Sequence, residues 1–325
     1  MAKQILVIAE VRDGALKPIT KEALTAALQV ADEASAVKAV LLGDGVENLA
    51  QQLCAFAPGG VLYLEDPALK TYTPEAYVAA LKNLVQETSA KYVFTGHSYQ
   101  AIDFFPRLAA TLDAAFIPDC TGIESDEKGL VFSRKVFNGK LDARCRVRSE
   151  GTVLTSLQQG AFPVGEAPGG GSVEKRKVDL SGVEARKVLS IEAGETGEVD
   201  LSEADIIVAG GRGVGDKDKF QIVFDLAKAL GGAVGASRPP CDSSWVEPFR
   251  QIGSSGQVVA PKLYVALGIS GAIQHLVGMR GSQCIVAVNK DPNAAIFQEA
   301  SYGLVGDLHE IVPALIEAVN EAREA

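Results

Sequence analysis

Three polar residues in the C-terminal part of the chain have the types and spacing to bind a cofactor that carries phosphate and ribose. Ser270, Asn289 and Asp307 each come just after a short apolar run. Such runs between small polar residues are typical of buried strands in a parallel sheet, and ligands bind outside the carboxyl ends of those strands. We therefore expect the three side chains to line one crevice. The runs cover residues 263–267, 283–288 and 303–306.

Small residues follow two of the expected strands in this region. Gly268 ends the run at 263–267, and Ser270 is placed to cap a helix that starts there. An earlier run at 205–209 is followed by the turn G-G-R-G-V-G at 210–215. Glycines in such a turn let backbone amides approach a phosphate, and a following helix adds partial positive charge. A purely structural turn is the alternative explanation of these glycines.

The glycine-rich turn differs from that of a nicotinamide-binding domain, whose spacing is G-x-G-x-x-G. The next expected strand, 233–236, is followed by Ser237 and Arg238 instead of the acidic residue that binds the ribose of NAD. Both differences argue against a nicotinamide-binding dehydrogenase domain, which is kept as the alternative from a different functional class.

The distribution of charge directs attention to two arginines. From residue 195 onward the chain has 17 acidic and 10 basic residues, so a pyrophosphate bound there needs positive groups close by. Arg212 and Arg238 both follow strand ends and are the predicted phosphate or cofactor contacts. Arg250, Lys262 and Arg280 are predicted to be surface charges.

The segment from residue 268 onward also resembles a known family. It reads G-I-S-G-A-I-Q-H-x-x-G-M, and an apolar strand and V-N-K-D-P-x-A-x-I-F follow. This run is similar to the FAD signature of the electron transfer flavoprotein α subunit. The resemblance covers nearly all of residues 200–325 and continues more weakly through the N-terminal half. It implies an electron carrier with one FAD and no catalytic residue acting on a substrate.

The resemblance implies roles for residues around the flavin ring. Arg212 matches the arginine that contacts the phosphate region, and Ser237 matches a serine that contacts the cofactor. Arg238 matches an arginine beside the isoalloxazine ring that favours the reduced, negatively charged flavin. Ser255 stands where the family has a threonine near flavin N5, so the hydroxyl is kept and the methyl that restricts its rotamer is lost. The same loop contributes Gln251, Ile252, Gly253 and Ser254.

The signature run itself implies the remaining cofactor contacts. The amides of the run and the Ser270 hydroxyl are expected along the phosphate and ribityl chain. His275 is expected to approach flavin O2, where a cation or dipole stabilises the charge that reduction adds. Asn289, Asp307 and Leu308 match the ribose and adenosine end. The other residues of the run in the expected site are Gly271, Ala272, Ile273 and Gln274.

Strands that alternate with helices must position these residues, and such alternation predicts parallel sheets. Strands are expected at 4–9, 37–42, 61–64, 92–95, 116–118, 205–209 and 233–236. Helices are expected at 20–34, 74–87, 103–112 and 216–230. Three consecutive short strands with the hairpin signal Asn138-Gly139 predict an antiparallel extension. These three strands are expected at 130–137, 140–148 and 152–157.

The sequence therefore predicts an α/β protein of two domains. The first, residues 1–193, has a parallel sheet with the antiparallel extension. The second, residues 194–325, is a Rossmann-like parallel α/β domain that binds FAD. The boundary is placed in an acidic stretch interrupted by glycine at 191–199, and the Gly- and Pro-rich stretch 161–172 is expected to be a loop.

Two features of the N-terminal half have competing interpretations. His97 follows an expected strand, but no second histidine or activated thiol accompanies it, so a structural role is preferred to a catalytic one. Arg144, Arg146 and Arg148 alternate with apolar residues and fall on one face of a strand. That face is either a solvated side of the extension or an electropositive surface near the cofactor or a partner.

Composition excludes several classes of function. The net charge of −10 argues against a general nucleic-acid binder. No apolar run approaches the roughly 20 residues that span a bilayer, and no signal-like segment is evident. The protein is therefore expected to be cytoplasmic. The five scattered cysteines contain no C-x-x-C pair and the three histidines lie far apart, so neither a disulfide framework nor a metal site is expected.

The resemblance also implies partners. These are a β subunit that completes the flavin pocket in a heterodimer, donors such as the acyl-CoA dehydrogenases of fatty acid β-oxidation, and a membrane flavoprotein-quinone oxidoreductase as acceptor. An electron-bifurcating member of the same family, or one dedicated to another pathway, is the closest alternative.

Overall fold

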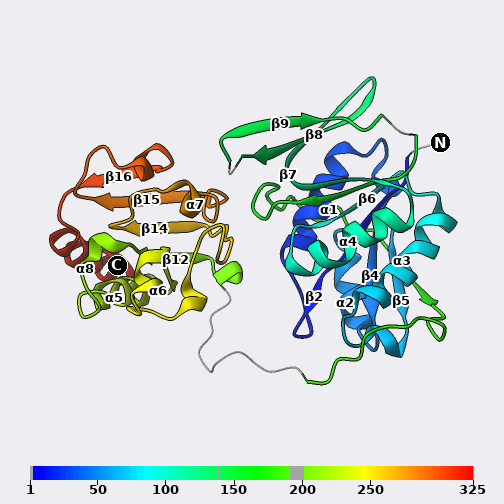
Figure 1. Cartoon of the computed structure of the whole chain (residues 1–325), viewed down its shortest axis with the longest axis horizontal. Coiled ribbons are helices and arrows are strands. Elements are labelled where there is room, and N and C mark those ends of the chain that lie inside the picture. The colour runs from blue at the N-terminus through cyan, green and yellow to red at the C-terminus, as the bar shows by residue number, and fades with distance from the viewer. Residues whose placement is uncertain (1–2, 138, 149, 191–200, 325) are drawn as a thin grey trace. The chain divides into compact units, whose positions relative to one another are not determined.

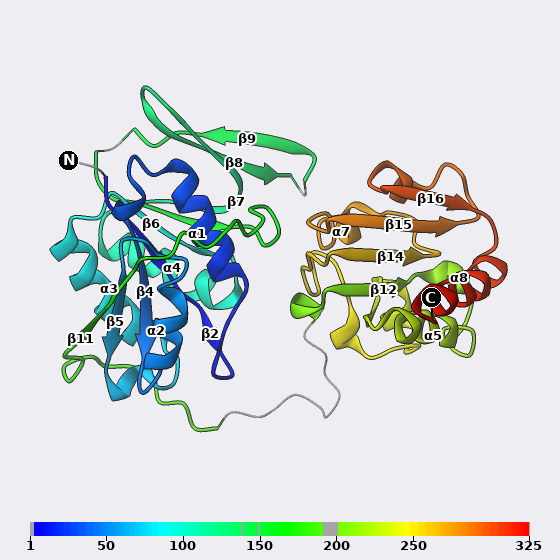
Figure 2. The same ribbon diagram turned by 180° about the vertical axis from the view of Figure 1, so that it is seen from behind.

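The structure is a computed structural model that describes residues 3–137, 139–148, 150–190 and 201–324. The chain separates into two compact units, Met1–Ile191 and Glu192–Ala325, shown in Figure 1 and from behind in Figure 2. Each unit is an α/β domain built on its own sheet, as predicted. The predicted boundary after residue 193 lies outside the described residues and stays a prediction.

The N-terminal unit is built on a nine-stranded sheet with the order β11-β5-β4-β1-β6-β10-β7-β8-β9. Pairing is parallel from β11 to β7 and antiparallel among β7, β8 and β9. A separate ribbon pairs β2 (Val11–Arg12) with β3 (Ala15–Leu16). The strands of the main sheet are β1 Ile5–Ile8, β4 Val37–Gly43, β5 Val61–Glu65, β6 Tyr92–Gly96, β7 Ala115–Asp126, β8 Gly129–Val136, β9 Leu141–Cys145, β10 Val153–Leu157 and β11 Val173–Lys177.

Helices on both faces bury this sheet. They are α1 Ile19–Val30, α2 Glu47–Leu53, α3 Pro74–Thr88 and α4 Tyr99–Thr111. Helix α4 begins four residues before the predicted start at 103, because the Ser98 hydroxyl caps it by accepting a hydrogen bond from the Ala101 amide at 3.1 Å. Short 3-10 helices lie at Ala34–Ala36 (η1) and Pro67–Leu69 (η2).

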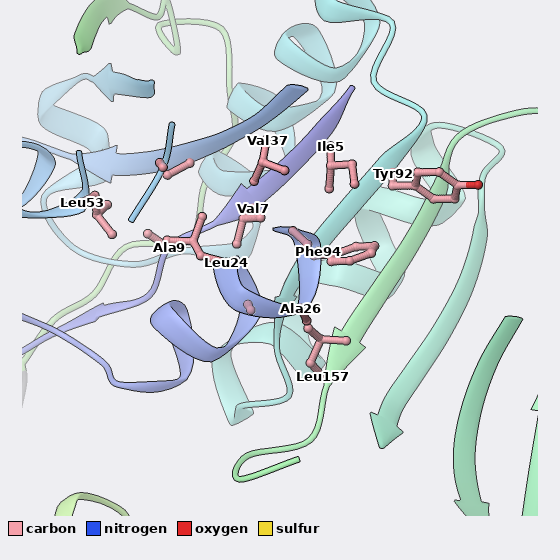
Figure 3. Close-up of a cluster of buried hydrophobic side chains, with 14 of the residues drawn as sticks. Ile5, Val7, Ala9, Leu24, Ala26, Val37, Leu53, Tyr92, Phe94 and Leu157 are labelled. Atoms are coloured by element: carbon pink, nitrogen blue, oxygen red, sulfur yellow. The ribbon is translucent and has the colours of Figure 1, made fainter. Parts of the chain in front are cut away.

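Figure 3 shows the apolar cluster on one face of the sheet. Ile5, Val37 and Phe94 of three neighbouring strands pack there with Leu24 of α1. A second cluster, with α3 and α4, covers the opposite face. Strands covered on both faces have nearly continuous apolar sequences, which is why their positions could be predicted.

The placement of the strand expected at 152–157 was wrong. We expected it in the antiparallel extension, but β10 lies between β6 and β7 and pairs parallel with both. All five of its residues are buried, as in a central strand. The extension consists of β7, β8 and β9 instead. Asn138 of the hairpin signal lies outside the described residues, although β8 and β9 on either side of it pair antiparallel.

Glu22 of α1 has a buried carboxyl group. We therefore expect the free energy of unfolding to depend on pH. Its Oε2 accepts a hydrogen bond from the Gly160 amide at 2.7 Å, the residue is 9% exposed, and burial raises its pKa from 4.5 to about 7. The stability contributed by the protonated group is complete below pH 4.5 and is lost as the pH rises through 7. Glu22→Gln should therefore gain on the order of 2–3 kcal/mol over the natural chain at pH 8.

Urea unfolding followed by far-UV circular dichroism at pH 4.5 and pH 8 measures this gain. The exposed Glu127 provides the control variant Glu127→Gln. A Glu22→Gln chain whose stability falls with pH as steeply as that of the natural chain would contradict the assignment.

The C-terminal unit has five parallel strands in the order β13-β12-β14-β15-β16. Figure 2 shows β12, β14, β15 and β16 side by side. β13 follows β12 in sequence and lies on one side of it, whereas β14 lies on the other side. The direction of winding therefore reverses between β12 and β14, and sheets of this kind bind ligands at such a point. The strands are β12 Ile206–Gly210, β13 Ala233–Ala236, β14 Leu263–Leu267, β15 Cys284–Asn289 and β16 Tyr302–Val305.

Different segments cover the two faces of this sheet. Residues of α5, α6 and α8 cover the first face, while α7 and the segment before β14 cover the second. No helix among the described residues is long and apolar enough to cross a membrane. The helices are α5 Gln221–Leu230, α6 Arg238–Asp242, α7 Ile273–Leu276 and α8 Leu308–Glu324, with 3-10 turns η3 Leu201–Glu203, η4 Arg212–Val214, η5 Pro248–Arg250 and η6 Ala295–Gln298.

Two predicted helix starts were wrong in this unit. The helix expected from 216 begins at Gln221, because η4 and a turn closed by Asp216, which accepts from the Lys219 amide, come first. Ser270 does not cap a helix, because Gly271 has a φ of 86° and a left-handed residue cannot be the first helical residue. Helix α7 starts only after Ala272.

Candidate cofactor site

The turns that follow β12 and β14 cross at the carboxyl edge of the C-terminal sheet. The Gly211 amide donates to Leu267 O at 2.8 Å, and the Gly213 amide donates to Gly268 O at 3.0 Å. A Cβ atom at Gly211 would lie 2.4 Å from Gly268 O. Close packing of the two turns therefore accounts for these glycines, which supports the structural explanation of the G-G-R-G pattern.

Arg212 is exposed in the first of these turns. Its guanidinium forms no ion pair with any residue that the structure describes. The turn is tied to α8, because the His309 imidazole lies 3.0 Å from the Val214 carbonyl oxygen and donates to it from Nε2. No role was predicted for His309, because nothing in the sequence of the last helix indicates this contact. An unpaired cation at this edge is available to an anionic ligand.

The segment after β14 has three unpaired backbone donors. The amides of Ser270, Gly271 and Ala272 donate to no other residue in the described part of the chain. The segment is anchored through its carbonyl group, because the Ile296 amide donates to Ser270 O at 3.2 Å. Consecutive free amides in a turn favour an anion. Together with Arg212, they fit the pyrophosphate of a dinucleotide.

Asn289 and Asp307 lie at the ends of the next two strands, as predicted, but both side chains have protein partners. Asn289 Nδ2 donates to Ile269 O at 2.8 Å, which joins it to the Ser270 segment. Asp307 caps α8 by accepting from the His309 amide at 2.9 Å, and its ion pair with Lys290 lowers its pKa. Their predicted contacts with ribose and adenosine stay predictions.

Leu308 presents only its backbone to this edge. Its side chain is buried in the cluster beneath α5 and α8. A cofactor contact of Leu308 would therefore have to be made by main-chain atoms.

Backbone hydrogen bonds hold the loop 251–256 at the same carboxyl edge of the sheet. The Ile252 amide donates to Ala236 O at 2.9 Å, beside Ser237 at the end of β13, and the Ser254 amide donates to Gln274 O at 2.7 Å. Gln251 Nε2 donates to the Ser255 hydroxyl at 2.9 Å. This hydrogen bond orients the Ser255 hydroxyl. In the threonine that the family has at this position, the methyl group would restrict the hydroxyl instead.

Among the arginines and lysines, one prediction was wrong. Arg250 is not a surface charge, since its side chain is 14% exposed and donates to Val234 O at 3.0 Å. Lys262 and Arg280 each pair with a carboxylate. Lys262 is exposed, and Arg280 is half-buried. Arg238 is exposed at the start of α6, where Nε lies 3.0 Å from Asp242 Oδ2.

His275 is enclosed by protein. It is 5% exposed, its Nδ1 lies 3.0 Å from Ile252 O, and its Nε2 lies 2.9 Å from the Tyr264 hydroxyl oxygen. Burial lowers its pKa to about 4, so the imidazole is neutral at physiological pH and offers a dipole without a charge. Its approach to flavin O2 stays a prediction. Tyr264 was missed, although a hydroxyl inside the apolar run L-Y-V-A-L needs a buried partner.

The two uncertain features of the N-terminal unit both have structural partners. His97 Nδ1 lies 2.8 Å from the hydroxyl oxygen of buried Ser156, and burial lowers the pKa of the imidazole. Arg144 pairs with Glu124 and Arg146 with Asp126, which favours the solvated-face interpretation of that strand. The five cysteines are free. Within the described ranges no group of His, Cys, Asp or Glu side chains could bind a metal ion.

A doubly wound parallel sheet with unpaired amides and an unpaired arginine at its switch point defines a dinucleotide-binding α/β domain. Residues 5–182 match the family model described as the electron transfer flavoprotein domain. Residues 200–280 match the electron transfer flavoprotein FAD-binding domain. The chain therefore belongs to the electron transfer flavoprotein family, as an alpha subunit, and FAD is the cofactor of its second domain.

Curated relatives match over nearly the whole chain. The electron transfer flavoprotein subunit alpha of Bacillus subtilis (strain 168) is 40% identical, covering 98% of this chain and 97% of the relative. The subunit alpha of Thermoanaerobacterium thermosaccharolyticum is also 40% identical, with 99% of each covered. Protein FixB of Clostridium saccharobutylicum is 38% identical, covering 98% and 97%.

Proposed function

We propose that this chain pairs with an electron transfer flavoprotein β subunit and carries electrons between flavoenzymes. The donors are acyl-CoA dehydrogenases or similar flavoenzymes, and the acceptor is a membrane flavoprotein-quinone oxidoreductase. The proposal places the heterodimer in the cytoplasm. The observation that carries it is the set of unpaired amides at Ser270, Gly271 and Ala272 beside the unpaired Arg212. FAD supplies the redox chemistry when bound.

The chain itself binds and orients the cofactor in this proposal. Arg212 and the free amides bind the pyrophosphate, and the Ser270 hydroxyl lies along the same path. Arg238 and the Ser255 hydroxyl meet the isoalloxazine ring, and Ser237 also contacts the cofactor. No side chain has to move a proton to or from a carbon substrate, so the chain acts as an electron carrier. The remaining proposed contacts come from Gln251, Ile252, Gly253, Ser254, Ile273, Gln274, Asn289, Asp307 and Leu308.

Purification of the chain alone and together with its β subunit tests this proposal. We expect a yellow heterodimer, with FAD identified after release, and a chain that loses flavin when expressed alone, because binding that needs both subunits links stability to both. A stable monomer with its full FAD would refute the need for a partner. A second FAD in the heterodimer would favour the bifurcating type.

The proposed position of Arg238 beside the isoalloxazine ring predicts an effect on the reduction potential of the flavin. Reduction adds negative charge to the ring, and a nearby guanidinium stabilises that product. Arg238→Ala should lower the first one-electron potential by on the order of 60 mV, which corresponds to a tenfold change in the equilibrium. Asp242→Asn removes the carboxylate that pairs with Arg238 and should shift the potential the opposite way. Spectroelectrochemical titration measures both. An unchanged potential in Arg238→Ala would remove this arginine from the ring.

A further inference from the structure

Tyr264 is a polar side chain in the middle of an apolar strand. It lies on β14 and is 0% exposed. Its ring belongs to the cluster formed with Ile252, Leu276 and Met279 on one face of the C-terminal sheet. A buried hydroxyl without a hydrogen bond is costly, and the hydroxyl oxygen of Tyr264 lies 2.9 Å from His275 Nε2. The tyrosine is therefore not explained by apolar packing alone.

The two contacts of His275 determine where its proton lies. Nδ1 lies 3.0 Å from Ile252 O, and a carbonyl oxygen can only accept, so Nδ1 carries the proton. The imidazole is neutral because burial lowers its pKa to about 4, so Nε2 is an acceptor. The Tyr264 hydroxyl, whose pKa burial raises well above 10, therefore donates to Nε2. The result is one directed chain, from Tyr264 through His275 to the Ile252 carbonyl.

This chain ends in the loop that bears Ser255. The loop 251–256 packs tightly on the segment after α7, since a Cβ atom at Gly278 would lie 2.4 Å from the Gly253 amide nitrogen. The hydrogen bond from His275 is the side-chain contact that joins the Ile252 carbonyl of this loop to the sheet. The side-chain amide of Gln251, one residue earlier, donates to the Ser255 hydroxyl and orients it.

We propose that Tyr264 and His275 are positioning residues, whose hydrogen-bonded chain to Ile252 fixes the loop 251–256 and thereby the Ser255 hydroxyl against the flavin. The role of His275 is then to orient the loop from within the protein. The part of the inference that concerns the flavin rests on the proposed function. The part that concerns the loop can be tested without any cofactor.

Amide hydrogen exchange over residues 251–257 tests the first part in the heterodimer, with FAD and after its removal. Tyr264→Phe takes away the donor that orders the imidazole, and exchange of this segment should rise roughly tenfold, the loss of about one buried hydrogen bond. Tyr77→Phe, at a buried tyrosine of α3 in the other unit, should leave the segment unchanged. Unchanged exchange in Tyr264→Phe would overturn the proposal.

Two substitutions of His275 keep the test informative if Tyr264→Phe fails to fold. An asparagine amide stands where Nδ1 was and can still donate to Ile252 O, whereas a glutamine amide reaches the position of Nε2 and loses that bond. His275→Asn should retain most of the protection of residues 251–257, and His275→Gln should lose it. Equal protection in the two variants would contradict a loop held through Nδ1.

The flavin potential tests the second part separately. If Tyr264 acts through Ser255, the potential shift caused by Tyr264→Phe should be absent in a Ser255→Ala background. Additive shifts in the double variant would show that Tyr264 acts by another route. A positive exchange result without an effect on the flavin potential would refute the contact of Ser255 with the flavin and leave the positioning of the loop intact.

Discussion

Replacing Arg212 by alanine is expected to weaken FAD binding about 10- to 150-fold. This range corresponds to about 1.5–3 kcal/mol, the contribution of a hydrogen bond to a charged group. Arg212 is exposed at the end of β12 without a carboxylate partner in the described residues, in a region rich in acidic residues. Its loss leaves the pyrophosphate with backbone amides and no adjacent cation. Titration of the flavin-depleted heterodimer with FAD, followed by flavin fluorescence, measures the change.

Two variants separate the specific contact from the general charge. Lys217→Ala removes an exposed cation from the same connection and should change FAD affinity by less than about threefold, because an exposed charge at a distance is screened by salt. Arg212→Lys keeps the charge but not the planar fork, so its affinity should be intermediate. Equal affinities of Arg212→Ala and the natural chain at physiological salt would place the phosphate elsewhere.

Replacing Gly271 by alanine should abolish cofactor binding and destabilise the C-terminal unit. Its φ of 86° is strained for any residue with a side chain, and the new Cβ atom would lie 2.2 Å from the Ile296 backbone nitrogen. The backbone must shift, which breaks the hydrogen bond from Ile296 to Ser270 O. We expect a loss of roughly 3 kcal/mol or more in the free energy of unfolding.

The only tryptophan, Trp245, reports on this unit alone. Its fluorescence during urea unfolding measures the loss. Gly231→Ala is the matched control, since Gly231 has a φ of 69° but a Cβ atom there would meet only the end of the Arg323 side chain, at 3.4 Å. It should cost about 1–2 kcal/mol, from backbone strain alone. Similar losses in the two variants would show that strain, without the clash, explains Gly271.

The sequence by itself determined the alternation of strands and helices and the residues at the strand ends. Parallel strands covered on both faces are continuous apolar runs, so β1, β4 and β12 could be located from local composition. Asn289 and Asp307 could be placed because each follows such a run. The signature at 268–279 was enough to indicate FAD, since its residue types are those of one family.

Only the tertiary structure decided which strands are neighbours and which side chains bond each other. The position of β10 between β6 and β7 depends on the chain returning after a hairpin, which no local pattern encodes. The partners of His275 are Tyr264, 11 residues away, and Ile252, 23 residues away. Periodicity describes one element at a time, whereas burial and hydrogen bonding depend on elements distant in sequence. Arg250 was misplaced for the same reason, because the carbonyl group that it contacts is 16 residues earlier.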